Sequence, residues 1–371
     1  MGDRNKKRLK RGKQLHSKLK QLRSFNVVAV FIAKNEEQAL PRLIKSLDGF
    51  ADRVVIVDTG STDNTIEVAK QLGAEVHSIA WPDSFSDARN KAVELANPAK
   101  ATWIAMFDAD EVLDKGRELR WKLQKISPHV GVISIYHRTK FGHKFPRNCI
   151  WRPGKAKWKY RFHEHLIPNE KGIQVIVPHF VDHPDDVGKN HDNDRIMELM
   201  RMDTVEYPEE QTRKYYYGRQ LFYRKEPNCL EILKEVYEKS PWSAEAAQAA
   251  VFAGNYFEWK ADKIKESDET NKESLAVEAL DIACSFYKMS VAKYPKLRGS
   301  YAGLIRTSRD IYERLVAAVT AMKIQESTFF DDPPRLYSQE GASKFIETIE
   351  KYKHLVKVEG EPVASNAEAI S

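Results

Sequence analysis

The stretch WIAMFDADE, residues 103–111, runs from apolar residues directly into three carboxylates, Asp108, Asp110 and Glu111. Its apolar part has the length and composition of a short buried strand. In α/β proteins, ligands bind beside the carboxyl ends of parallel strands. The stretch therefore predicts a buried strand with a candidate site at its end.

Two earlier apolar segments end in the same way. NVVAVFIAKNEE (26–37) runs into KNEE, and ADRVVIVDTGSTDNT (51–65) runs into DTGSTD. Helical patterns separate these strands, and strands that alternate with helices of roughly ten residues indicate βαβ units around a parallel sheet. We therefore expect an α/β fold in which three polar clusters meet at one edge of the sheet.

The pattern becomes helical after about residue 190. Pro208, Pro241 and Pro295 follow helical segments at intervals of 33 and 54 residues, and the second interval contains the charged stretch 260–274, which resembles an insertion. A period near 34 favours tetratricopeptide-like helical pairs, with a plain helical bundle as the alternative. We expect four parts: a basic arm (1–25), an α/β domain (26–190), a helical tetratricopeptide-like region (191–325), and a C-terminal helix and tail (326–371).

The positive charge of the chain is concentrated in the basic arm. Residues 1–25 hold ten Lys or Arg and one Asp, a charge of +9, whereas the whole chain of 371 residues carries +7. The remainder therefore carries about −2, the difference between these values. The arm is either a solvated tail or a cationic helix that contacts nucleic acid or an anionic membrane surface.

Cysteine usage and hydropathy indicate a cytoplasmic protein. Cys149, Cys229 and Cys284 are widely spaced and form neither a disulfide framework nor a CxxC metal pair. No apolar run approaches the roughly 18 residues that cross a bilayer, and we expect no signal peptide. Peripheral contact with the inner membrane face is the alternative that the basic arm leaves open.

The carboxylates at the strand ends favour a metal site. Asp108 and Asp110 would repel each other if both were ionised, unless a cation lies beside them. Mg²⁺ or Mn²⁺ prefers such oxygen ligands and is typically held by one or two carboxylates together with substrate phosphates. The alternative is a helix N-terminus, where carboxylates favour the helix dipole. In the second loop, Asp63 is explained as a cap for a helix near Thr65, whereas Asp58 is left to bind a base or ribose.

Five blocks in order carry a resemblance to a known family: KNEE, VDTGSTDNT, FSDARN, WIAMFDADE and FHEH. They resemble the family 2 glycosyltransferases of GT-A fold, in the branch where a tetratricopeptide-like helical region follows the catalytic domain. The resemblance covers roughly residues 26–240. It implies a Rossmann-like GT-A domain that binds a nucleotide-sugar, usually a UDP-sugar. It also implies a hexosyltransferase reaction with inversion at the anomeric carbon.

The resemblance implies roles for individual residues. Arg89 would contact the diphosphate, and Asp110 would bind the Mn²⁺ or Mg²⁺ that bridges it. Thr59 stands where familiar relatives carry a second aspartate, which matters little if Asp58 contacts the base. The residues expected to border the nucleotide-sugar are Ala33, Lys34, Glu36, Asp58, Asp87, Arg89, Asn90 and Asp108.

The reaction also needs a general base. An acceptor hydroxyl must lose its proton on the face opposite the leaving group, a task for a carboxylate or, less often, a histidine. Glu164 of FHEH is the candidate, with His163 and His165 as candidate metal or diphosphate ligands. In a regular strand Glu164 faces away from both histidines, so all three share the site only if the segment is a loop. The reserve candidates are Glu111, Asp182, His179 and His183.

The acceptor is left open by the sequence. Trp151, Arg152 and Trp158 precede FHEH and could stack on a sugar or base or grip a phosphate; an exposed hairpin without this role is the alternative. We rank a saccharide or protein acceptor above a hydroxylated base in DNA. A non-catalytic nucleotide-sugar-binding scaffold is the rival from another class. A nucleotidyltransferase would need a Gly-rich basic loop after the first strand, which KNEE is not.

Overall fold

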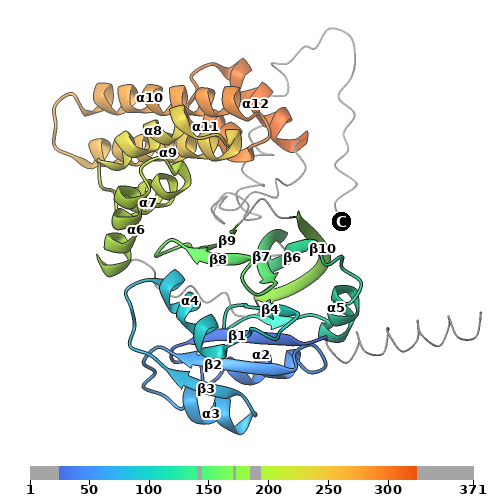
Figure 1. Ribbon diagram of the computed structural model, residues 1–371. Coiled ribbons are helices and arrows are strands. Elements are labelled where there is room, and N and C mark those ends of the chain that lie inside the picture. Colours follow the sequence, from blue (N-terminus) through green and yellow to red (C-terminus); the bar gives the residue numbers. More distant parts are fainter. Residues whose placement is uncertain (1–24, 140–143, 170–172, 184–193, 324–371) are drawn as a thin grey trace, which may run out of the picture. The chain divides into compact units, whose positions relative to one another are not determined.

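A computed structural model of the chain describes residues 25–139, 144–169, 173–183 and 194–323 (Figure 1). These residues form two compact units, named here unit 1 (up to Pro208) and unit 2 (from Glu209). The expected basic arm, apart from Phe25, and the expected C-terminal tail lie outside the described residues. No described helix is both long and apolar enough to cross a bilayer.

Unit 1 contains the predicted α/β fold. The strands of its main sheet are β1 (Val27–Ala33), β2 (Arg53–Asp58), β3 (Glu75–Ser78), β4 (Trp103–Ala105), β5 (Val112–Leu113), β6 (Val130–Thr139), β7 (Lys144–Trp151) and β10 (Ile173–His183). Among the described residues, they lie in the order β3-β2-β1-β4-β7-β6-β10-β5. β1 pairs in parallel with β2 and β4, and β2 pairs in parallel with β3, as the alternating pattern predicts.

The second half of the sheet is mixed, which the sequence did not reveal. β7 lies between β4 and β6 and runs antiparallel to both, whereas β10 is parallel to β6. β4 and β6 therefore point their carboxyl ends at the same edge. β8 (Ala156–Lys159) and β9 (His165–Pro168) form a separate hairpin. β8 lies in the aromatic and basic stretch before the FHEH block, and β9 begins at the last residue of that block.

Alternate residues of β1 enter two separate cores. Val27, Ala29 and Phe31 belong to one cluster of buried side chains, and Val28 and Val30 belong to another. This is the period of two expected of a strand covered on both faces. The helices of unit 1 are α2 (Leu40–Ser46), α3 (Thr65–Gln71), α4 (Phe85–Ala96), α5 (Gly116–Leu123) and α6 (Asp194–Glu206).

Helices on both faces leave one edge of the sheet to carry the polar loops. α2, α3 and α5 contribute buried side chains to the cluster with Phe31, whereas α4 and the β8–β9 hairpin contribute to the cluster with Val30. Ala33 at the end of β1 lies opposite Asp58 at the end of β2. The polar segments after β1, β2 and β4 therefore lie at one edge, as predicted.

Unit 2 is helical, as predicted for the region after the sheet. Its described helices are α7 (Gln211–Tyr223), α8 (Cys229–Lys239), α9 (Ser243–Glu266), α10 (Lys272–Lys293), α11 (Arg298–Thr307) and α12 (Ile311–Lys323). Consecutive helices contact each other, and α9 also contacts both α7 and α11. Stacking of successive helices in this way is typical of helical repeat proteins.

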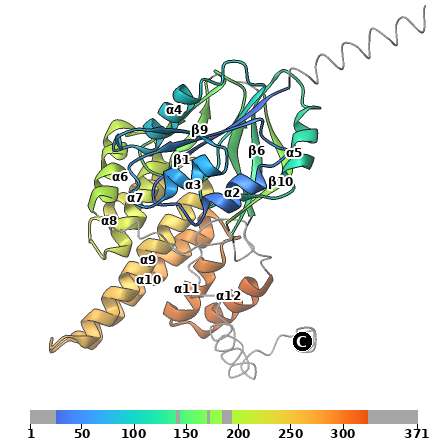
Figure 2. The same ribbon diagram turned by 90° about the horizontal axis from the view of Figure 1, so that it is seen from below.

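The charged stretch 260–274 is largely helical rather than a loop insertion. α9 continues to Glu266 and α10 begins at Lys272, so the stretch lengthens a helical hairpin (Figure 2). Small side chains let the two helices approach closely and explain why a charged stretch still forms helices. Ala261, Ala276 and Ala279 are buried together in one cluster.

Candidate functional site

Hydrogen bonds join the loops after β1 and β2. The Asn35 N–H donates to Ser61 Oγ (2.9 Å), and Asn35 Oδ1 accepts the Thr62 N–H (2.7 Å). The Glu36 N–H donates to Thr65 Oγ1 (2.8 Å). These contacts fix the first loop, in which the expected nucleotide neighbours differ in exposure: Ala33 is buried, Lys34 is exposed and Glu36 is half-buried.

Asp58 shapes the second loop. Its carboxylate accepts the N–H groups of Gly60 (2.9 Å) and Ser61 (3.2 Å), and the residue is buried. Gly60 has a φ of +103°, which side-chain-bearing residues rarely adopt. Asp63 accepts the Thr65 N–H (3.0 Å) at the start of α3, as expected of a residue that satisfies the first helical turn. Asp58 therefore holds this loop whether or not it also contacts a nucleotide.

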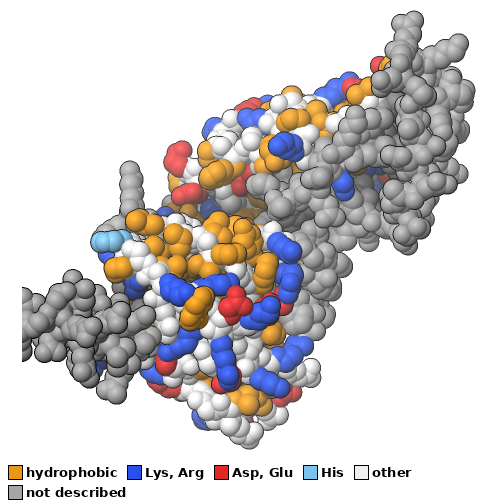
Figure 3. All heavy atoms as spheres, turned by 90° about the vertical axis from the view of Figure 1, so that its right-hand side faces the viewer, with side chains coloured by type: hydrophobic (Ala, Val, Ile, Leu, Met, Phe, Trp, Pro, Cys, Tyr) orange, Lys and Arg blue, Asp and Glu red, His pale blue; other side chains and the backbone are white. Residues whose placement is uncertain are grey.

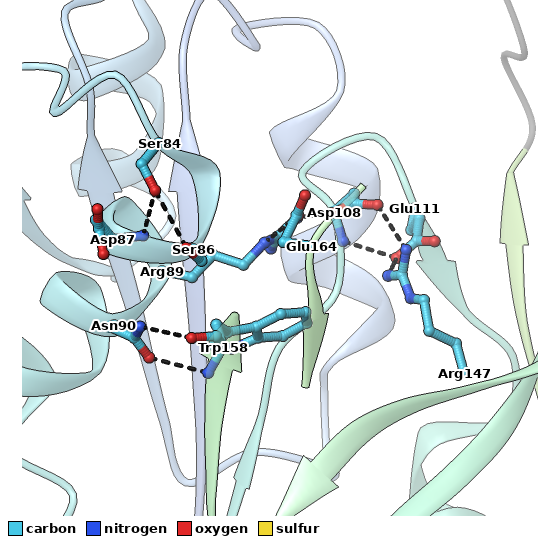
Figure 4. Close-up of polar contacts among 10 residues, drawn as sticks. All are labelled: Ser84, Ser86, Asp87, Arg89, Asn90, Asp108, Glu111, Arg147, Trp158 and Glu164. Atoms are coloured by element: carbon cyan, nitrogen blue, oxygen red, sulfur yellow. Dashed lines mark hydrogen bonds and ion pairs between the residues drawn. The ribbon is translucent and has the colours of Figure 1, made fainter. Parts of the chain in front are cut away.

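α4 carries the SDARN residues and begins at a capped N-terminus. Ser84 Oγ accepts the Asp87 N–H (3.1 Å), and the Asp87 side chain is exposed in the first turn. Asn90 pairs twice with the backbone of Trp158, donating from Nδ2 to its carbonyl oxygen (2.9 Å) and accepting its N–H at Oδ1 (3.1 Å) (Figure 4). Asn90 thus ties α4 to β8.

Arg89 lies buried between two carboxylates (Figure 4). Its Nε donates to Glu164 Oε1 (2.6 Å) and its Nη2 donates to Asp108 Oδ1 (2.5 Å). The guanidinium carbon lies 4.7 Å from the ring centre of Trp158. Burial opposes the positive charge, but Glu164 and Asp108 raise the pKa of Arg89, so it stays protonated. Arg89 Nη1 is buried and has no hydrogen-bond partner among the described residues.

Arg147 continues the network on the other side of Asp108. Its Nη1 donates to Asp108 Oδ2 (2.9 Å), and its Nη2 donates to Glu111 Oε2 (2.9 Å). Glu111 is completely buried, and its Oε1 lies 2.7 Å from His137 Nδ1. Burial opposes ionisation of Asp108, but Arg147 and Arg89 outweigh it and lower the pKa of this carboxyl. We call the connected side chains the charge network: Glu164, Arg89, Asp108, Arg147, Glu111 and His137.

Sequence reasoning missed Arg147 and His137. Both lie on strands that the expected topology did not pair, since β6 and β7 are antiparallel neighbours. The signal was an ionisable side chain next to apolar ones, in ISIYH (133–137) and RNCIW (147–151). A buried ionisable group needs a partner, but the sequence alone does not say which partner the sheet supplies.

The three carboxylates after β4 take different positions. The Glu111 N–H donates to the Asp108 carbonyl oxygen (3.1 Å), which closes a turn across Ala109 and Asp110. Asp108 and Glu111 enter the charge network, whereas Asp110 is half-buried on the turn. Within the described ranges, no three His, Cys, Asp or Glu side chains are placed to hold a metal ion by themselves. Asp110 fits a cation that takes its other ligands from phosphates and water, the usual arrangement for Mg²⁺.

Residues 160–164 form an irregular turn rather than a strand. Tyr160 and His163 have φ angles of +76° and +51°, and β9 begins only at His165. The loop condition for FHEH is therefore met, because strand alternation does not separate Glu164 from His163. The Glu164 side chain is 12% exposed. His163 is half-buried and His165 is exposed.

The tryptophans expected to contact an acceptor are buried. Trp151 and Trp158 are 2% and 4% exposed and pack edge-to-face with ring centres 6.2 Å apart. Arg152 lies over Trp103, with its guanidinium carbon 4.0 Å from that ring centre, and donates from Nε to the Val130 carbonyl oxygen (2.9 Å). An acceptor contact requires exposed faces, so the burial of both tryptophans contradicts that expectation for them.

The reserve candidates for the base lie in paired or buried positions. Glu111 is buried inside the charge network. Asp182 accepts two hydrogen bonds from Arg138, at 2.6 and 2.9 Å. His179 is buried with Nε2 beside the Asp114 carbonyl oxygen (2.5 Å), and burial lowers the pKa of its imidazole. His183 ends β10. Glu164 is the carboxylate that Arg89 joins to the strand-end Asp108.

Comparison with known proteins matches part of unit 1 to a family model. Residues 28–157 match the model described as "Glycosyl transferase family 2". The chain is 25% identical over 225 residues to the SPbeta prophage-derived glycosyltransferase SunS of Bacillus subtilis, covering 55% of this chain and 51% of that protein. It is 38% identical over 96 residues to a TPR repeat-containing protein of Synechococcus elongatus, covering 25% of this chain and 23% of that protein. The chain thus spans about half the length, or less, of these relatives.

A solved structure also aligns with part of the chain. It is glucosyl-3-phosphoglycerate synthase from Mycobacterium tuberculosis in complex with Mn²⁺, UDP and glucosyl-3-phosphoglycerate. The alignment covers 32% of this chain and 46% of that chain, with 20% identity and a TM-score of 0.27. A score this low supports no conclusion about the site.

Proposed function

Residues 28–157 form a glycosyl transferase family 2 domain, and from this premise we propose that the whole chain transfers a sugar from a nucleotide-sugar, with inversion at the anomeric carbon. The observation that carries the proposal is the charge network at the carboxyl edge of the sheet. It links the strand-end Asp108 to Glu164 through one buried guanidinium, that of Arg89. Perturbed, paired ionisable groups of this kind concentrate at functional sites.

We propose that the loops after β1 and β2 border the nucleotide, with a UDP-sugar as the donor. Hydrogen bonds join these two loops. Exposed Lys34 and the turn that the Asp58 carboxylate holds therefore lie at the same edge of the sheet. The unpartnered Nη1 of Arg89 is the donor group that a diphosphate or sugar oxygen would accept from. Asp108 is held in its place by Arg89 and Arg147 and would lie near the ribose.

We propose Glu164 as the general base. Its Oε1 is occupied by Arg89 Nε–H, which fixes the direction of the carboxylate. Oε2 is then the oxygen that removes the proton from the acceptor hydroxyl as that hydroxyl attacks the anomeric carbon. The bond to the nucleoside diphosphate breaks on the opposite face, so the configuration inverts.

We propose that this edge of the sheet binds Mn²⁺ or Mg²⁺. Asp110, with His163 or His165, would hold it, and it would offset the charge that develops on the departing diphosphate. Asp108 is less suited to this task, because both of its carboxylate oxygens accept hydrogen bonds from arginines.

For the acceptor we propose a saccharide or a protein. The consecutive packing of the helices in unit 2 supports a tetratricopeptide-like region, and helical repeats typically present extended binding surfaces. DNA with modified bases is weakened as an acceptor, because Trp151 and Trp158 have no exposed face on which a base could stack. A non-catalytic scaffold is weakened because both a base candidate and a metal-ligand candidate are present.

We propose a cytoplasmic location, with peripheral contact at an anionic surface through the arm at 1–25. The three cysteines are buried thiols, which fits a reducing compartment. A described surface of unit 1 also combines apolar and basic side chains (Figure 3). Among the exposed apolar side chains of unit 1, Trp121, Ile173 and Ile176 are 57%, 55% and 52% exposed, and Lys125 Nζ lies over the Trp121 ring.

A donor screen tests the proposed function. Full-length protein is incubated with Mn²⁺ or Mg²⁺ and a panel of UDP-, GDP- and TDP-sugars, and released nucleoside diphosphate is measured. We expect metal-dependent release from one donor and a loss of about 100-fold or more in Asp110→Ala, because that variant removes the carboxylate proposed to hold the metal. The absence of both nucleotide release and metal-dependent nucleotide binding by calorimetry would contradict the proposal, whereas binding without release from any donor would favour the nucleotide-sugar-binding scaffold.

A further inference from the structure

The turn that carries Glu164 has a strained backbone. Tyr160 and His163 both have left-handed φ angles although neither is glycine, a conformation that is costly for residues with a side chain. Such conformations persist only where surrounding contacts determine them. The contacts that hold this turn therefore decide where Glu164 points.

A single buried carboxylate outside the matched family region accepts three hydrogen bonds from this turn. Asp203 lies on α6 and is 2% exposed. Its Oδ2 accepts the N–H groups of Arg161 (2.8 Å) and Phe162 (3.3 Å), and its Oδ1 accepts from Arg161 Nη1 (2.9 Å). Burial raises the pKa of Asp203, against the opposing effect of these donors. The carboxylate is costly to bury and all of its described partners belong to the turn.

α4 holds the same turn from its other side. The Phe85 N–H donates to the Arg161 carbonyl oxygen (2.9 Å). Asn90 pairs with the backbone of Trp158 in β8, just before the turn begins. Arg161 is thus fixed by α4 through its carbonyl and by α6 through its N–H and guanidinium. Glu164 follows three residues later and meets Arg89, which α4 also carries.

We infer that Asp203 is a positioning residue for Glu164: it holds the 160–164 turn in the one conformation that brings the candidate base against Arg89. This inference rests on the proposed function. It also places the start of the helical segment inside the catalytic unit, since α6 lies beyond residue 157, where the family match ends, yet belongs to unit 1.

The test is a double-mutant cycle on the full-length chain, with the best donor from the UDP-, GDP- and TDP-sugar screen. Asp203→Asn offers one acceptor oxygen in place of two and sets an amide N–H₂ against an N–H donor of the turn. We expect turnover to fall about 10- to 100-fold, the effect of a displacement near 1 Å at the reacting groups. Donor affinity by calorimetry should stay within about threefold, because the β1 and β2 loops are untouched.

If Asp203 only stabilised the fold, Asp203→Asn would lower turnover equally with and without the Glu164 carboxylate. In a Glu164→Gln background, Asp203→Asn should lower turnover by less than about twofold, because residues that act as one unit are not additive. Glu198→Gln is the matched control: it is also on α6, pairs with Arg201 and is exposed, and it should turn over the donor at the wild-type rate.

The outcomes separate the inference from the proposed function. Wild-type turnover by Asp203→Asn overturns the inference alone, as does an equal loss in the Glu164→Gln background. A wild-type chain that neither releases nor binds a nucleotide overturns the proposed function and this inference with it. If Asp203→Asn does not fold, Arg161→Gln goes through the same cycle, since it removes the guanidinium contact and keeps both backbone bonds; unchanged turnover there overturns the inference.

Discussion

The charge network of unit 1 and the core of unit 2 around Tyr287 are both buried but are built in different ways. In unit 2, Tyr287 fills the space left by Gly254 and Gly303, and a Cβ at Gly303 would meet its ring at 2.3 Å. In unit 1, buried Arg89, Glu111 and His137 are joined in one network with half-buried Asp108, Arg147 and Glu164. Shape complementarity stabilises a fold directly, whereas buried ion pairs often contribute little net stability. The difference indicates that the charge network is kept for chemistry.

The largest effect that would sharpen this comparison is expected from Arg147→Leu. It leaves completely buried Glu111 without its arginine partner, while Asp108 keeps Arg89, and removing one partner of a buried pair costs about 3–5 kcal/mol. Urea denaturation followed by circular dichroism measures the free energy of unfolding. The control is Arg138→Leu, whose pair with Asp182 is about one-third exposed and should contribute about 1 kcal/mol or less. Equal effects of the two variants would contradict the account of the network.

A smaller loss is expected from Gly303→Ala in unit 2. The added methyl group would overlap the Tyr287 ring, and overpacking of a core typically costs about 1–3 kcal/mol. Part of this is offset, because alanine favours a helix over glycine by about 1 kcal/mol. Urea denaturation measures the net change in the free energy of unfolding. Tyr287→Leu should relieve the clash, so the double variant should be less unstable than the sum of the two single variants. If the two single losses of stability simply add in the double variant, the Tyr287 ring does not fill the space beside Gly303 as described.

The smallest effect is a pH dependence that comes from His137. Burial and the nearby Arg147 lower the pKa of His137 from its ordinary 6.5, against the attraction of Glu111. The unfolded chain therefore binds a proton below about pH 6.5 that the folded chain does not, and stability falls as the pH drops through that range. Asp108 has a lowered pKa as well, so its contribution is retained until the pH is far more acidic.

The melting temperature between pH 7.5 and 5.5 tests this dependence. We expect the wild type to lose stability toward pH 5.5 and His137→Gln, which does not titrate, to lose less over the same interval. A His137→Gln variant with the same slope as the wild type would assign the dependence to another group.

The sequence predicted the parts of unit 1 that depend on local pattern. The strands with polar ends, the parallel pairing of β1 with its neighbours and the meeting of three loops at one edge all follow from apolar runs and their spacing. The antiparallel β7 did not follow, because its pairing between β4 and β6 joins segments far apart in the chain. Arg147 reaches the site only through that pairing.

The candidate site shows the same limit. Asp108 was recognised from its position after a strand, and Glu164 from its block. Their connection through Arg89 was not, since Arg89 was expected to contact a diphosphate. Trp151 and Trp158 were expected to contact an acceptor because they alternate with basic residues, yet the β8–β9 hairpin packs on the sheet and buries them. Alternation shows that a strand has two faces but does not show which face is covered.

The most direct test of the central claim compares donor turnover by the wild type and by Glu164→Gln. The variant keeps an oxygen that accepts from Arg89 and removes only the ability to take a proton. The account predicts a fall in turnover of about 100- to 10,000-fold, the usual contribution of a general base, with donor affinity by calorimetry nearly unchanged at a temperature where circular dichroism shows both proteins folded. Turnover within a few-fold of the wild type would contradict the assignment of Glu164 as the base.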